Sequence, residues 1–101
     1  MTSNNVVVLL KKAEEDVAQA YAWYEKQERG LGEEFLRCVD AAIQLIGRNP
    51  EMYSKVHKDF RKCVVRRFPY MIFYEYSPNT VTIFAIFHCS QHPQKWRGLL
   101  A

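Results

Sequence analysis

The spacing of hydrophobic residues changes twice along the chain and predicts the order of its elements. Residues 6–10 form a short, continuous apolar run rich in β-branched side chains, which predicts a buried strand. Over residues 11–29 and 31–47, apolar side chains return every three or four positions, the period of a helix with one buried face. From residue 61 onward the period is two, which favours strands.

Each predicted helix has one apolar stripe and a recognisable end. Gly30 and Gly32 separate the two helices, and Gly47 with Pro50 ends the second. Because this connection is short, the helices are expected to pack as an antiparallel hairpin. The stripes consist of Ala13, Val17, Ala20, Tyr21 and Tyr24 in the first helix and of Leu31, Phe35, Val39, Ala42 and Ile46 in the second.

The second half of the chain predicts three strands joined by short links. Phe68-Pro69 separates the first from the second, because proline cannot donate to a strand ladder, and a turn precedes the third. Such links make an antiparallel meander. The polar residues 51–60 before it predict a surface loop. The three strands are expected over residues 61–67, 70–76 and 81–88.

The chain, residues 1–101, therefore predicts one α+β domain of order β-α-α-β-β-β, with the helical hairpin on one face of a mainly antiparallel sheet. The first strand is expected either beside the last strand or at the other edge. The last two strands are apolar on both faces. The face away from the helices is therefore predicted to be an aromatic-rich concavity or to be covered by a partner. The aromatics are expected in the core, with stacking on nucleic-acid bases as the alternative.

Basic residues are concentrated in the second half of the chain. Residues 1–50 contain six Lys or Arg and eight Asp or Glu, a net charge of −2, whereas residues 51–101 contain eight and three, a net charge of +5. Most of the excess lies within residues 55–67. This clustering favours an anionic partner, either nucleic acid or an acidic protein. The alternative is a solvated basic edge that keeps a strand from aggregating.

Metal and thiol chemistry have little support in the sequence. His88 and His92 flank Cys89 but provide too few ligands for a metal site, so no metal and no other cofactor is expected. Cys38 and Cys63 are expected to be buried small hydrophobes rather than catalytic thiols. Three widely spaced cysteines favour a reducing cytoplasm. Neither a signal peptide nor a membrane span is predicted at the N-terminus.

Motifs across residues 5–97 occur in the order and spacing of a known family. They are Ala13-x-x-Asp16 with Trp23-Tyr24, then Gly30-Leu31-Gly32-x-x-Phe35, Asn49-Pro50-x-x-Tyr53, Arg61-Lys62 with Arg66-Arg67-Phe68-Pro69-Tyr70-x-Ile72-x-Tyr74, and finally His88 with Pro93 and Trp96. On these motifs the chain resembles the ParE/RelE toxins of type II toxin–antitoxin systems. The resemblance implies a cytoplasmic toxin that a cognate antitoxin keeps silent.

Two branches of that family poison different targets, and fold alone does not separate them. The ParE branch blocks DNA gyrase, whereas the RelE branch cuts messenger RNA on the ribosome. RelE-type nucleases often carry an arginine where this chain has Met71. Their near relatives often carry arginines in the segment that corresponds to residues 89–92, and this chain has none there. We therefore expect a ParE-like toxin without RNA-cleaving chemistry. The alternatives are a RelE-like ribosome-dependent endoribonuclease and a non-toxic module that only binds an antitoxin.

The resemblance also implies which residues form the site. A nuclease would draw charge and acid–base groups from Arg66, Arg67, His88 and His92. Strand alternation predicts that Arg66 and Arg67 point to opposite faces, away from a shared phosphate. No membrane partner is expected, and a homodimer is an option when the chain is alone. The residues expected to bind target or antitoxin are Arg61, Lys62, Arg66, Arg67, Tyr70, His88 and Trp96.

Overall fold

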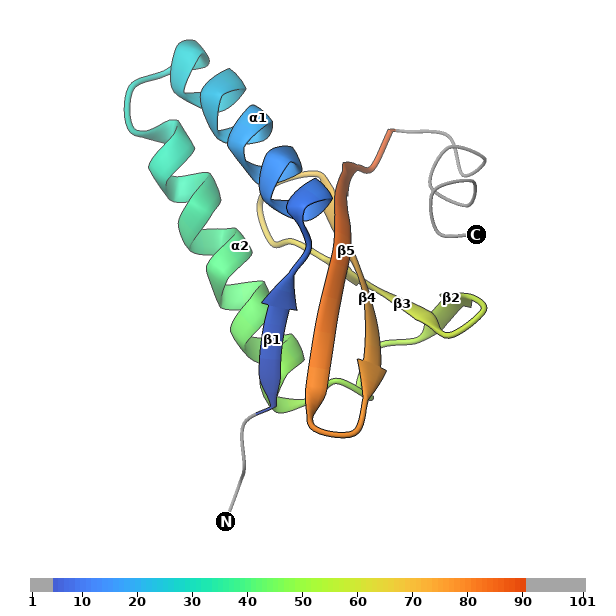
Figure 1. Cartoon of the computed structure of the whole chain (residues 1–101). Helices are drawn as coiled ribbons and strands as arrows, with labels where there is room; N and C mark the ends of the chain where they lie inside the picture. The colour runs from blue at the N-terminus through green and yellow to red at the C-terminus, as the bar shows by residue number, and fades with distance from the viewer. Residues whose placement is uncertain (1–4, 91–101) are drawn as a thin grey trace.

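A computed structural model describes residues 5–90 and confirms the predicted order of helices and strands, with one strand added (Figure 1). Both helices are where their apolar stripes predict, and the first ends at Gln27, two residues early. The elements are β1 (Val6–Leu9), α1 (Lys11–Gln27), α2 (Leu31–Arg48), β2 (Lys55–His57), β3 (Phe60–Val64), β4 (Tyr70–Ser77) and β5 (Thr80–His88).

The strands form one mixed sheet in the order β1-β5-β4-β3-β2. The three meander strands pair antiparallel, as predicted. β1 lies beside the last strand and runs parallel to it, with Val6 opposite Thr80 and Leu9 opposite Ile83. Of the two edges left open by the sequence, β1 occupies the one next to β5, and β2, which follows the helical hairpin, occupies the other (Figure 1).

The prediction that residues 51–60 form only a loop is wrong at β2. Lys55 pairs with Arg61 and His57 with Phe60, so the chain reverses tightly between the two strands. Lys58 adopts a positive φ of 52° in this reversal. Three residues at a sheet edge are too few to show a period of two, and main-chain pairing rather than side-chain burial defines the strand.

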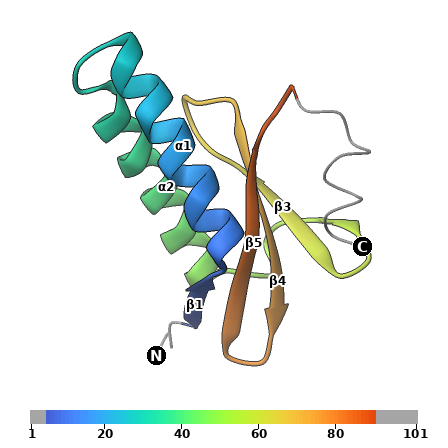
Figure 2. The ribbon, with the colours of Figure 1, turned by 45° about the horizontal axis from the view of Figure 1, so that its top comes forward.

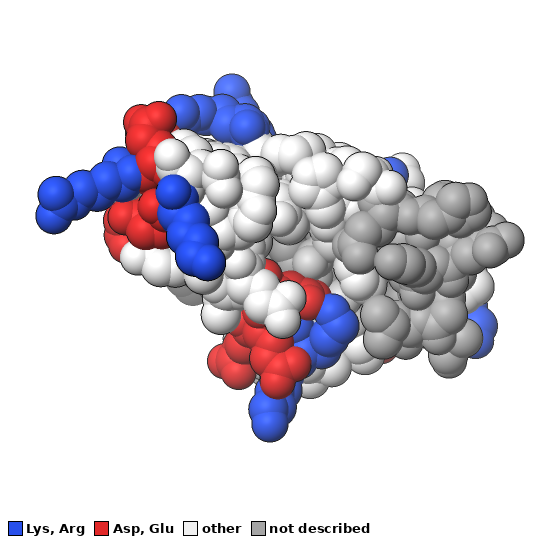
Figure 3. All heavy atoms as spheres, turned by 90° about the horizontal axis from the view of Figure 1, so that it is seen from above, with Lys and Arg blue, Asp and Glu red and all other residues white. Residues whose placement is uncertain are grey.

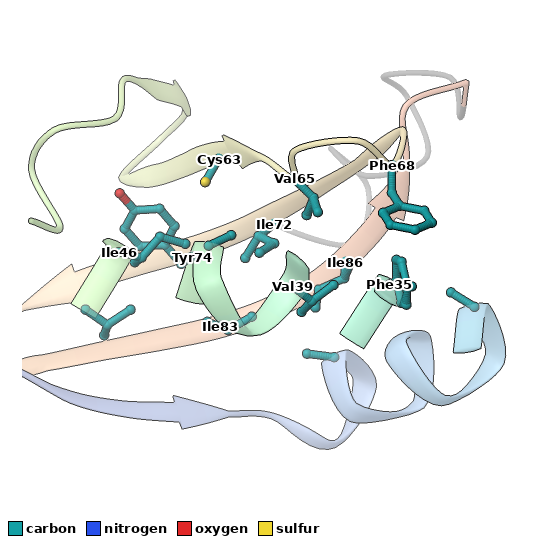
Figure 4. Close-up of a cluster of buried hydrophobic side chains, with 14 of the residues drawn as sticks. Phe35, Val39, Ile46, Cys63, Val65, Phe68, Ile72, Tyr74, Ile83 and Ile86 are labelled. Carbon is teal, nitrogen blue, oxygen red and sulfur yellow. The ribbon is translucent and has the colours of Figure 1, made fainter. Parts of the chain in front are cut away.

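Both helices lie on the same face of the sheet, as predicted (Figures 1 and 2). The core between the two layers is made of large apolar side chains from α2, β3, β4 and β5 (Figure 4). Burying each of them contributes about 1.5–3 kcal/mol to folding. The fully buried members include Phe35, Ile46, Cys63, Ile72, Tyr74, Val81 and Ile83.

A second apolar cluster lies on the opposite face of the sheet. Partly buried Val56 and Phe84 pack against it. Its core side chains are at most 8% exposed, so the open aromatic concavity expected on this face is not seen at these residues. The cluster does confirm that β4 and β5 are apolar on both sides. Its buried members are Phe60, Met71, Phe73, Ala85 and Phe87.

A carboxylate holds the turn between the helices. Glu25 accepts hydrogen bonds from the backbone N–H groups of Gly30 (3.0 Å) and Gly32 (2.9 Å). Gly30 has a φ of 89°, which only glycine adopts without strain. A Cβ at Gly32 would stand 2.8 Å from both Glu25 and the Tyr21 ring. The Gly-x-Gly sequence therefore ends the first helix and also leaves room for the Glu25 carboxylate to bind the turn of the hairpin.

A buried phenol ties β4 to the end of α2. The Tyr74 hydroxyl donates to the Pro50 carbonyl at 2.6 Å, and burial raises the pKa of this phenol. Tyr74→Phe would leave that carbonyl without its donor, so we expect the free energy of unfolding to fall by about 1–2 kcal/mol in urea denaturation. Tyr76→Phe is the control, since the hydroxyl of Tyr76 makes no hydrogen bond within residues 5–90. An equal loss in both variants would contradict the prediction.

Candidate functional site

The bend between β3 and β4 positions most of the predicted site residues. The strand expected over residues 61–67 ends at Val64, so the two arginines lie in the bend rather than in a strand. Val65 donates its N–H to Tyr70 O (2.9 Å), and Arg67 adopts a φ of 72°. Cys89 N–H donates to Pro69 O at 2.7 Å, which fixes the bend beside the end of β5.

Four aromatic rings, packed mostly edge to face, hold this bend against the helices. Phe68 inserts between α1 and α2, with ring centroids 4.9 Å from Tyr24 and 5.3 Å from Phe35. Tyr70 packs 5.1 Å from Phe35. We call Tyr24, Phe35, Phe68 and Tyr70 the aromatic cluster. Edge-to-face pairs of this kind add about 0.5–1.5 kcal/mol each beyond their burial, so the bend is rigidly placed.

A cavity of about 350 Å³ opens where α1 passes the end of the sheet, and we call it the sheet-end pocket. Asp16 accepts the Ile86 N–H at 2.9 Å and forms an ion pair with Lys12. The Lys12 ammonium also lies 4.9 Å from the centre of the Phe87 ring. The charges of the pocket are thus internally paired. Its lining is Lys12, Asp16, Gln19, Ala20, Trp23, Tyr70, Ile86, Phe87 and His88.

His88 stands in this pocket with its ring orientation fixed. Its ring centroid is 5.1 Å from that of Tyr70, and its Nδ1 accepts the Ser90 N–H at 3.0 Å. The ring is thus held by Tyr70 on one side and by Ser90 at Nδ1.

A second cavity, of about 400 Å³, lies between α2 and β3, and we call it the arginine groove. Arg66 and Arg67 both line it, so the prediction that they point to opposite faces is wrong, because strand alternation does not extend into the bend. Arg67 lies 3.3 Å from Glu34 in an exposed ion pair, which adds little to stability. The lining is Arg37, Cys38, Ala41, Ala42, Leu45, Tyr53, Cys63, Val64, Arg66 and Arg67.

Arg61 and Lys62 do not line either of these cavities. Arg61 donates to the carbonyls of Tyr53 (2.6 Å) and Glu51 (3.4 Å), so its guanidinium clamps the chain before β2. Lys62 lies opposite Phe73 in the ladder, on the face away from the helices. The predictions for His92 and Trp96 lie outside the described residues.

Sequence reasoning missed Trp23 as a site residue. Its side chain is 56% exposed and lines the sheet-end pocket beside Tyr70. The sequence did contain a signal that Trp23 is exposed. This residue lies between Ala20 and Tyr24 in the sequence but outside the apolar stripe that they form. A large exposed aromatic on a helix is a feature of binding surfaces.

Charge on the helical side of the molecule is mixed. Figure 3 shows Lys and Arg side chains beside Asp and Glu side chains over the helical hairpin. Across residues 5–90, no group of three or more His, Cys, Asp or Glu side chains is arranged to hold a metal ion. Within the same residues, no helix has the length and apolar character needed to span a bilayer.

The family model of the ParE toxin of type II toxin–antitoxin systems, parDE, matches residues 7–93, which include the hairpin, all of the sheet except Val6, and both cavities. The chain belongs to the ParE toxin family. A search of curated protein sequences finds no significant match.

Two solved structures share the fold of this ParE-family chain. One, titled as the chromosomal ParDE TA system from P. aeruginosa, has a TM-score of 0.63 and 14% identity, covering 83% of this chain and 95% of that one. The other, the RelBE2 toxin–antitoxin complex from Mycobacterium tuberculosis, has a TM-score of 0.64 and 16% identity, covering 90% of this chain and 98% of that one. The resemblance inferred from the sequence motifs is thereby confirmed at the level of family and fold.

Asp16 links α1 to β5 in this ParE-family chain, so its replacement should lower the free energy of unfolding. Its side chain is 12% exposed and holds both the Ile86 N–H and Lys12. Asp16→Ala would leave that amide without its acceptor, so we expect a loss of about 1–3 kcal/mol in the free energy of unfolding. Glu15→Ala is the matched control, because Glu15 is exposed on the same helix. Equal stability of the two variants would show that Asp16 does not anchor α1.

Proposed function

We propose that this ParE-family chain is a cytoplasmic toxin that inhibits DNA gyrase by binding, without cutting RNA, and that a cognate antitoxin neutralises it. The supporting observation is the separation of its candidate catalytic groups. His88 lines the sheet-end pocket, whereas Arg66 and Arg67 line the arginine groove on the other side of the aromatic cluster. A nuclease needs an acid–base group and cations around one phosphate.

The residues around His88 argue against RNA cleavage. The cation in its pocket is Lys12, which is paired with Asp16, and the histidine's Nδ1 accepts from Ser90. Met71, which replaces the arginine often found in RelE-type nucleases, is 7% exposed in the second apolar cluster. Its side chain packs against the sheet, so this position offers no charge to a substrate phosphate.

The sheet-end pocket is the proposed target-binding surface. Trp23, Tyr70 and His88 line it and combine flat apolar rings with hydrogen-bonding groups. Residues of this kind carry most of the binding energy at protein interfaces. Among the described residues that line the pocket, the charges of Lys12 and Asp16 are paired with each other, which favours a protein surface over the phosphate backbone of a nucleic acid.

An antitoxin partner is supported by the solved relatives. The titles of the two structures name a ParDE TA system and a RelBE2 toxin–antitoxin complex. The family match over residues 7–93 supports the same assignment for this chain. We propose that the adjacent reading frame encodes a protein that binds this chain and suppresses its toxicity.

The choice between gyrase and messenger RNA is tested by two assays on the purified chain. We expect inhibition of gyrase supercoiling at stoichiometric toxin, and intact message in a translation reaction followed by primer extension. Losing two oriented charge contacts to the transition state is expected to slow RNA cleavage up to about ten-thousandfold. New codon-specific ends would overturn the proposal in favour of a RelE-like endoribonuclease. No effect in either assay would support the non-toxic antitoxin-binding module.

Replacing the exposed tryptophan tests the target surface. Trp23→Ala removes the largest exposed ring of the sheet-end pocket, so we expect affinity for gyrase to fall by roughly 30-fold or more, the size of an interface hot spot. Met52→Ala is the matched control, because Met52 is 57% exposed but does not line this pocket. Thermal unfolding of both variants checks that the fold is kept. Unchanged inhibition by Trp23→Ala would place the target elsewhere.

A further inference from the structure

We propose that the free edge of β1 pairs antiparallel with β1 of a second copy of this chain, which joins the two sheets into one across a twofold axis at Val8. This inference goes beyond the proposed function and does not depend on which target the chain acts on. Three features of the described residues support it. They are an unprotected strand edge, a row of exposed apolar side chains that is complementary to itself, and a symmetric arrangement of charge on α2.

The first feature is the set of main-chain groups that β1 leaves unpaired at the edge of the sheet (Figure 1). Val6 and Leu10 donate their N–H groups to the β5 side, at 2.9 and 3.0 Å, whereas Asn5 donates in the other direction, to the end of α2 at 3.3 Å. Because these directions alternate along a strand, the N–H and C=O groups of Val7 and Leu9 point to the outer edge. Within residues 5–90, no strand pairs with β1 on that edge.

This edge also lacks the features that keep an edge strand from pairing with another chain. The opposite edge strand, β2, has three residues, a register shift and the charged Lys55. Residues 6–10 are all apolar and contain neither proline nor glycine. Soluble proteins protect their sheet edges by charge, by irregularity or by a covering segment. The edge of β1 is therefore suited to being covered by another strand.

The second feature is a row of exposed apolar side chains along residues 6–10. Val6, Val8 and Leu10 are 61%, 41% and 37% exposed, whereas Val7 and Leu9 pack against the core on the helix side of the sheet. In an antiparallel pair centred on Val8, the two copies of Val8 face each other and Val6 faces Leu10 of the second copy. The outward main-chain groups of Val7 then meet those of Leu9 of the second copy. One register therefore pairs both the exposed side chains and the free main-chain groups of the strand.

The third feature is the charge on α2 beside this edge. Asp40 and Arg48 lie four residues before and after Gln44, so the three share one exposed face of the helix. Gln44 and Val7 line the same cavity of about 510 Å³, which places this face beside the centre of the strand pair. A twofold axis there sets Asp40 of each copy toward Arg48 of the other. Neither residue forms an ion pair within residues 5–90.

These features favour a second copy of this chain over another protein. A strand from any protein could use the free main-chain groups, whereas a second copy necessarily supplies matching apolar side chains and charges in the opposite order. No residue of β1 lines the sheet-end pocket or the arginine groove. The dimer would therefore present two copies of each cavity, and its interface would not compete with them.

The oligomeric state of the purified full chain tests the proposal. We expect sedimentation equilibrium to show reversible dimers between about 1 μM and about 1 mM, the range of weak to moderate affinities. Val8→Lys sets two like charges opposite each other at the axis, so we expect the dissociation constant to rise by on the order of a hundredfold. Val64→Lys is the matched control, because Val64 is another exposed valine but lies on β3, and it should dimerise as the wild type does.

A mixture of charge variants separates loss of the interface from loss of the fold. Val8→Glu alone should be as monomeric as Val8→Lys. An equimolar mixture of the two should form dimers again, because opposite charges then meet at the axis. An unfolded variant would not be rescued in this way.

Cysteine cross-linking tests the register. Under mild oxidation, Val8→Cys should give a disulfide-linked dimer, because the Cα atoms of such a directly opposed pair lie about 4.5 Å apart. Val6→Cys is the control, because Val6 faces Leu10 of the second copy and not its own counterpart. It should cross-link no more than the wild type, whose own cysteines give the background.

The alternatives give different results. A wild-type chain that stays monomeric over the whole concentration range would overturn the proposal. Dimers that persist in Val8→Lys, or charge variants that do not recombine, would overturn β1 as the interface. Equal cross-linking of Val6→Cys and Val8→Cys would overturn the register. If the wild type is monomeric and Val8→Lys weakens binding to the product of the adjacent reading frame, the edge belongs to that partner instead.

Discussion

Packing of four aromatic rings is the constraint on which the rest of the structure depends. Tyr24 comes from α1, Phe35 from α2, Phe68 from the β3–β4 bend and Tyr70 from β4, so the aromatic cluster joins both layers of the molecule. It fixes the bend that carries the arginines, and through the Tyr70–His88 contact it fixes the end of β5. The positions of both cavities therefore depend on the packing of the aromatic cluster.

Side-chain periodicity was sufficient for the parts of the fold held by burial. The stripe around Phe35 and Ile46 predicts α2, and the alternation around Ile72 and Tyr74 predicts β4, because these side chains are the core. It failed at β2, where backbone pairing defines the strand, and at the end of β3. The arginines in that bend are exposed, so nothing in their hydrophobicity could indicate that the strand had ended.

The candidate site was predictable in composition but not in arrangement. Tyr70 and His88, both predicted as site residues, lie side by side because the ladder pairs them directly. Arg61 resembles its basic neighbours in sequence, yet its guanidinium donates to the carbonyls of Tyr53 and Glu51, contacts that the pattern of charge along the chain does not reveal. Trp23 was not predicted as a site residue, because its position on a helix does not indicate whether its exposed ring lines a cavity.

The parallel pairing of β1 with β5 has a consequence for the order of assembly. Val6 is among the first described residues of the chain, and its partner Thr80 is close to the last strand's start, so this contact spans most of the sequence. The helical hairpin is local and can form early, whereas the sheet cannot be completed until β5 has been made. A partially synthesised chain therefore lacks both the His88 end of the sheet-end pocket and the β4–β5 support beneath the bend. Both binding surfaces are therefore complete only after β5 has been synthesised.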